Sequence, residues 1–131
     1  MMKLQAITLE IEFWKELMDP DNYYHDSKED KFQINYDRIS LNRPELSIFK
    51  ISSPLCSQYL NSMCIGCQLN CSNKYGTENY SNFQNFHNSK SIKSKIKNAE
   101  RIYNKLNADL MIEIELTKIN SKSLLEDQSN N

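Results

Sequence analysis

All four cysteines of the chain lie in one short segment, residues 56–71, with the spacing Cys-x7-Cys-x2-Cys-x3-Cys. Thiolates are preferred ligands of structural zinc, and the two sulfurs of a Cys-x2-Cys turn can point at one ion. Gly66 lies inside that turn, where the lack of a side chain lets backbone N–H groups approach the sulfurs. We therefore expect the segment to form a metal-binding loop whose ligands are Cys56, Cys64, Cys67 and Cys71.

Other interpretations of these cysteines remain open. Cys64, Cys67 and Cys71 recur at helical steps, so they could be buried thiols on one face of a helix. Disulfides among the four cysteines are a further alternative. Cys-x2-Cys-x3-Cys also closes the cysteine run of bacterial ferredoxins, which makes an iron–sulfur cluster the alternative cofactor. A site with three thiolates and His87 is a further variant, although we expect His87 and His25 to be surface residues.

Residues 89–105 form the most basic block of the sequence. Six bases against one acid give this block a charge of +5, whereas residues 1–31 carry −4. A helix would align five of the bases in a stripe that attracts phosphate groups. The block therefore predicts a nucleic-acid surface, unless the acidic segment neutralises it within the fold. The candidate nucleic-acid-binding residues are Lys90, Lys93, Lys97, Arg101 and Lys105.

Aromatic residues lie close to this block in the sequence, namely Tyr75, Tyr80, Phe83, Phe86 and Tyr103. Exposed aromatic rings would stack on unpaired bases. Buried rings would instead belong to the hydrophobic core, and the sequence leaves both roles open.

Several function classes find no support in the sequence. With 2 glycines the chain has no glycine-rich phosphate loop, and neither His-Glu-x-x-His nor Gly-x-Ser-x-Gly occurs. Four thiolates around zinc would leave no open position for a catalytic water. No segment approaches the ~20 apolar residues of a membrane helix. We expect a non-enzymatic cytoplasmic protein, in which clustered thiols stay reduced and act as ligands.

The hydrophobic pattern predicts a small α+β domain over residues 1–120, with a few short antiparallel strands packed on one main helix. That helix is predicted over 89–106, where apolar residues recur every three or four positions and Ser89 or Ser91 can cap the start. Residues 121–131 contain few apolar side chains, so we expect a disordered tail.

Alternating apolar residues predict the strands. They indicate strands at 7–13 and 108–119, with a helix over 4–18 as the close alternative to the first. Residues 32–39 and 45–51 are predicted to form a hairpin, and 19–31 a surface loop.

The run PLCSQYLNSMCIGCQLNC, together with ENYSNF and the later IKNAERIYNKL, resembles a group of small phage and bacterial proteins. Their pattern is Leu-Cys followed by an aromatic residue, then Cys, x-Gly-Cys-Pro, a later Cys, an aromatic pair and an amphipathic helix. In this chain Gln68 replaces the proline, and the gap before Cys71 is shorter. The resemblance spans half of the chain and implies a zinc-bound module at the four cysteines, with no activity attached.

The sequence therefore predicts a zinc-stabilised, cytoplasmic accessory protein that binds a protein or a protein–nucleic-acid partner. The resemblance implies a phage origin, and for a phage-encoded protein the compartment is the host cytoplasm. One alternative is a protein that binds nucleic acid directly through the basic helix 89–105. The other is an iron–sulfur redox or sensing protein.

Overall fold

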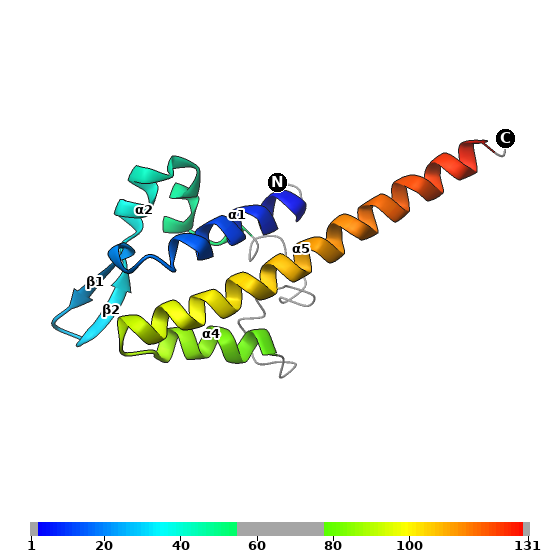
Figure 1. Cartoon of the computed structure of the whole chain (residues 1–131). Helices are drawn as coiled ribbons and strands as arrows, with labels where there is room; N and C mark the ends of the chain where they lie inside the picture. The colour runs from blue at the N-terminus through cyan, green and yellow to red at the C-terminus, as the bar shows by residue number, and fades with distance from the viewer. Residues whose placement is uncertain (1–2, 55–77, 130–131) are drawn as a thin grey trace.

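The computed structural model describes the backbone of residues 3–54 and 78–129, and the side chains of residues 3–54 and 82–122. Figure 1 shows one long helix, α5, with α1 along one side and α4 along another. The predicted small α+β fold is confirmed in outline, because a two-stranded antiparallel sheet accompanies this long helix. The helices and strands are α1 (Lys3–Glu16), β1 (Tyr23–Asp26), β2 (Lys31–Ile34), α2 (Tyr36–Asn42), α4 (Glu78–Asn88) and α5 (Ile92–Ser129), with short 3-10 helices η1 (Pro20–Asn22) and η2 (Pro44–Lys50).

Residues 7–13 lie within α1, so the predicted strand is wrong and its helical alternative is correct. Ile7, Ile11 and Trp14 follow one another at steps of four and three, and all three are buried. This spacing places them on the same side of the helix, which packs against α5. The alternation with Thr8 and with the acidic residues is therefore compatible with a helix.

Residues 108–119 are also helical, so the second predicted strand is wrong. The helix predicted over 89–106 is confirmed but continues to Ser129, giving α5 38 residues. At ~1.5 Å per residue it is about 57 Å long. Ser91 caps its start, since the Ser91 hydroxyl oxygen accepts the backbone N–H of Ser94 at 3.1 Å.

The hairpin predicted between 32–39 and 45–51 is wrong. β2 pairs instead with β1, which lies inside the predicted surface loop 19–31; Tyr23 faces Ile34 and Asp26 faces Lys31. After β2 the chain becomes helical, because the Asn35 side chain accepts the Arg38 N–H at 3.1 Å and so caps α2. Residues 44–50 then form η2.

Asn22 joins the elements at this end of the molecule, and it is 1% exposed. Its amide nitrogen donates to the Glu16 carbonyl at 2.8 Å, and its amide oxygen accepts from Arg38 at 3.2 Å. Its backbone carbonyl accepts the Asn35 N–H at 2.8 Å. Nearby, the Tyr23 hydroxyl donates to the Leu17 carbonyl at 2.6 Å, and burial raises the pKa of Tyr23. These bonds fix the sheet against the end of α1.

Arg43 links η2 to α1 through three carboxylates. Its guanidinium meets Glu12 at 2.9 Å and Glu16 at 3.4 Å, and also pairs with Glu45. The hydrogen bonds that Arg43 donates to Glu45 and Glu12 raise the pKa of Arg43. Arg43 therefore holds the segment that starts η2 beside the outer face of α1.

Replacing Arg43 with methionine should lower the free energy of unfolding by about 1 kcal/mol, because the bonds to Glu12 and Glu16 are lost and both are only partly screened by solvent. Urea unfolding in low salt measures this change, and 1 M salt should shrink the difference. Lys15→Met, on the exposed side of α1, is the control and should unfold like the unaltered chain. An equal loss in both variants would contradict the role given to Arg43.

The same variant has a predicted pH dependence. In the unaltered chain, the Glu45 carboxylate accepts hydrogen bonds from the Glu45 backbone N–H and from Arg43. These bonds lower the pKa of Glu45 below its ordinary value of 4.5. The Glu45 carboxylate therefore takes up a proton at a higher pH in the unfolded chain than in the folded protein. The free energy of unfolding accordingly falls as the pH drops below about 4.5. In Arg43→Met this acid-side loss should be smaller, as measured by melting temperature between pH 5 and about 3.

Candidate nucleic-acid interface

The predicted metal ligands Cys56, Cys64, Cys67 and Cys71 lie outside the described residues. Among the side chains of residues 3–54 and 82–122, no cluster of three or more His, Cys, Asp or Glu is placed to hold a metal ion. His25 is exposed and its Nε2 lies 3.1 Å from Asp30 Oδ1. The ring of His87 packs against Phe83, and partial burial, with Lys95 and Lys31 nearby, lowers the pKa of His87.

The basic block folds as the second arm of a helical hairpin formed by α4 and α5. The end of α4 is tied to α5 by side chains. Lys95 Nζ donates to the Phe86 carbonyl at 2.8 Å, and the Asn98 amide donates to the Asn85 carbonyl at 3.3 Å and to Ser89 Oγ at 2.9 Å. Carbonyls in the last turn of a helix have no partner within it. Here the Phe86 carbonyl also accepts the Ser89 N–H at 3.3 Å and the Asn85 carbonyl also accepts the Ser89 hydroxyl, so both carbonyls are shared between donors of the connecting turn and of α5. The hairpin is thereby fixed in register.

Lys95 is a buried residue that stabilises the hairpin, although it belongs to the basic block in the sequence. It is 5% exposed, and its ammonium lies 4.6 Å from the centroid of the Phe86 ring. Burial is the main cause of the lowered pKa of Lys95, with Lys31 adding to it. The negative end of the α4 dipole and the aromatic face both compensate for the buried charge.

A shallow groove runs along the outer side of this hairpin, and we call it the basic groove. It consists of two adjoining hollows of ≈ 460 and ≈ 530 Å³ that share Arg101. The first is lined by Asn85, Asn88, Ser89, Lys90, Ser94, Lys97, Asn98 and Arg101. The second is lined by Asn82, Arg101, Asn104, Lys105 and Ala108.

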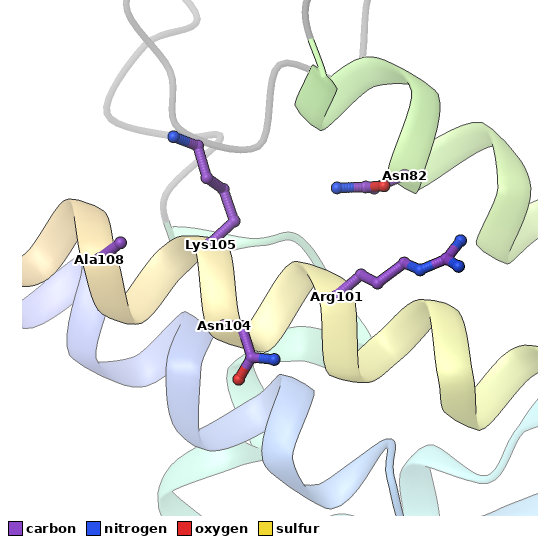
Figure 2. A pocket seen from close by; sticks show the side chains of 5 residues that line it. All are labelled: Asn82, Arg101, Asn104, Lys105 and Ala108. Carbon is purple, nitrogen blue, oxygen red and sulfur yellow. The ribbon is translucent and has the colours of Figure 1, made fainter.

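Figure 2 shows the second hollow of the basic groove. Arg101 reaches from α5 toward α4, and Asn82 extends from α4 into the same space. Lys105 rises from α5 one turn farther along. The Arg101 guanidinium donates to Asn98 Oδ1 at 3.3 Å, which orients it along the groove. A cation and an amide from different helices therefore face one ligand-sized opening.

The charge of the basic groove is largely uncompensated. Among the described residues, no carboxylate forms an ion pair with Lys90, Lys97 or Arg101, whereas Lys105 meets Asp109 at 3.6 Å. Burial raises the pKa of Asp109, and Lys105 opposes that shift. The groove thus presents three cations without a described counter-charge.

Neutralisation of the block by the acidic segment 1–31 is not seen in the described part of the chain. Glu12 and Glu16 of that segment pair with Arg43. In the ion pair that joins α1 to α5, the base comes from α1 and the acid from α5, because Lys3 meets Glu113 at 2.9 Å. The described ion pairs therefore leave the positive charge of the groove available to a ligand.

Four of the five candidate nucleic-acid-binding residues line the groove: Lys90, Lys97, Arg101 and Lys105. Lys93 is exposed but does not line it, because a stripe of every fourth residue drifts around a helix by ~40° per step. Phe86 is buried in the core, and Phe83 and Tyr103 pack against that core. Tyr75 and the side chain of Tyr80 lie outside the described residues.

The sequence did not identify the polar residues that complete the groove. Asn82, Asn85 and Ser89 follow each other at steps of three and four, so they share one side of α4 and its end. Ser94 and Asn98 repeat this pattern on α5. Small polar residues at helical spacing beside a basic stripe are the signal that could have found them.

None of the described helices contains an apolar stretch long enough to span a lipid bilayer. Comparisons with protein-family models, curated proteins and solved structures found no match for this chain.

Proposed function

We propose that this protein is a non-enzymatic nucleic-acid-binding protein whose basic groove holds the phosphate backbone. The observation that supports this most directly is that Lys90, Lys97 and Arg101 line one open groove without a described carboxylate partner. Cations in this arrangement attract a polyanion, and each phosphate contact releases condensed counterions.

The other side chains of the groove suit the same ligand. Asparagine amides and serine hydroxyls donate hydrogen bonds to phosphate and sugar oxygens, which position a nucleic acid without reading its bases. The described lining residues include no aromatic side chain on which a base could stack. We therefore expect binding that depends little on base sequence, whether to a free strand or to nucleic acid in a protein complex.

Fluorescence anisotropy with a labelled oligonucleotide tests this proposal. Replacing both Lys97 and Arg101 with alanine should remove two phosphate contacts. The slope of log affinity against log salt should then become less steep by about 2. Oligonucleotides of different base sequence should be affected alike.

The matched control is Lys15→Ala/Lys28→Ala. Both residues are exposed and lie outside the groove. Each double variant loses two positive charges, so the two variants have the same net charge. It should bind almost as the unaltered chain does. If both double variants lose affinity equally, the groove is not the binding surface and only net charge matters. If the unaltered chain binds no oligonucleotide in low salt, the proposal is wrong.

We further propose that Cys56, Cys64, Cys67 and Cys71 bind one structural zinc ion, on the basis of their spacing. Mass spectrometry under non-denaturing conditions should detect one zinc ion per chain, and this ion should leave when the thiols are modified. Visible absorbance with bound iron would instead identify the iron–sulfur alternative. A bare polypeptide would contradict both.

A further inference from the structure

The second half of α5 exposes a line of large apolar side chains. Ile112, Leu116 and Ile119 are 57%, 49% and 57% exposed, and they follow each other at steps of four and three. This spacing places them on one face of the helix, which we call the apolar seam. In Figure 1 this part of α5 extends beyond both α1 and α4.

Such a segment lacks the packing that normally supports a helix. In proteins most helical stability comes from burying an apolar face against another element, and an isolated helix in water is marginal. Among the described contacts, α1 reaches α5 as far as Glu113 through Lys3. The seam beyond that point is solvated in the single chain, so a partner that covers it would stabilise the helix.

The charges beside the seam indicate what that partner is. Glu115 and Lys122 are seven residues apart, about two turns, so they flank the seam on the same side. When two copies of a helix pair antiparallel, the same flank of each faces the other. Glu115 of one copy then meets Lys122 of the other, and the pair occurs twice by symmetry.

The apolar contacts agree with this register. If a two-fold axis passes between residues 117 and 118, Leu116 of each copy lies against Ile119 of the other. Ile112 then closes each end of the contact. A parallel pair in the same seam would place Glu115 opposite Asn120 and would gain no ion pair.

We propose that the protein forms a symmetric dimer through antiparallel pairing of the apolar seam, with Glu115 of each copy facing Lys122 of the other. Within its own helix Glu115 meets Lys118 at 3.6 Å, and both side chains are more than half exposed, so this contact is weak and leaves Glu115 available. The interface is small, so we expect a weak dimer that forms only at high protein concentration.

Sedimentation equilibrium of the full chain tests the dimer. At about 100 µM the unaltered protein should approach twice the chain mass of 15.4 kDa. Glu115→Lys and Lys122→Glu should each be monomeric, because each creates two like-charge contacts across the seam. The double variant Glu115→Lys/Lys122→Glu should dimerise again, since it restores both pairs with exchanged signs and has the original net charge.

Lys28→Glu reverses a charge at an exposed turn and should still dimerise. Circular dichroism should show that all these variants remain folded, because the altered side chains are exposed. The proposal is overturned if the unaltered chain keeps a single-chain mass at every concentration. It is also overturned if either single reversal leaves the dimer intact, or if the double variant stays monomeric.

Discussion

Replacing Phe86 with alanine should lower the free energy of unfolding by about 3–5 kcal/mol, the range for truncating a buried aromatic side chain. Phe86 is 1% exposed and joins three elements. Its ring lies 5.0 Å from Trp14 of α1 and 6.4 Å from Tyr23 of β1, while Phe86 itself belongs to α4. Alanine would leave a cavity where these elements meet, and it would remove the ring beneath the Lys95 ammonium. Chemical denaturation with urea measures the change.

Two variants control for this result. Phe86→Leu keeps much of the volume and should cost about 1–2 kcal/mol. Tyr24→Ala removes an aromatic ring of which half is exposed and should have a much smaller effect than Phe86→Ala. Equal losses for Phe86→Ala and Tyr24→Ala would show that Phe86 does not anchor the packing of α1, β1 and α4.

Changing all four cysteines to serine should lower the melting temperature by at least about 10 °C. If Cys56, Cys64, Cys67 and Cys71 bind zinc, metal binding contributes on the order of 10 kcal/mol, part of which is offset by ordering the loop. A strong chelator added to the unaltered protein should cause a similar fall, and added zinc should reverse it. Differential scanning calorimetry measures both.

The serine variant is its own control for the chelator, because its melting should not respond to chelator or zinc. Buried thiols without metal would behave differently. The chelator would then have no effect on the unaltered chain, while the serine variant would still lose stability through its buried hydroxyl groups. That outcome would contradict the zinc site.

The main helix was predictable because its signals are local. The apolar spacing between Ile92 and Leu106 fits a helix and no strand, and Ser91 is a cap within the same segment. The strands predicted at 7–13 and 108–119 failed because both segments have apolar residues two, three and four positions apart. The choice depends on α1 packing against α5, a contact between opposite ends of the chain. The periodicity of apolar residues in one sequence gives no information about a contact between distant segments.

The same limit applies to the candidate site. The cations of the groove were predictable, since Lys97 and Arg101 share one helix. Asn82 was not, because it comes from α4 and meets Arg101 only through the hairpin. The structural role of Lys95 was not predictable for the same reason: the Phe86 carbonyl that it caps lies nine residues earlier, in another helix.

The capped turn between α4 and α5 has a consequence for ligand binding. Lys95, Ser89 and Asn98 hold the ends of the two helices together before any ligand arrives. The walls of the groove are therefore preorganised, and Arg101 is already oriented by Asn98. If the groove binds a nucleic-acid strand as proposed, the strand would need to order only the long side chains of Lys90 and Lys97. Little backbone entropy would be lost on association, so even a few phosphate contacts would yield a measurable affinity.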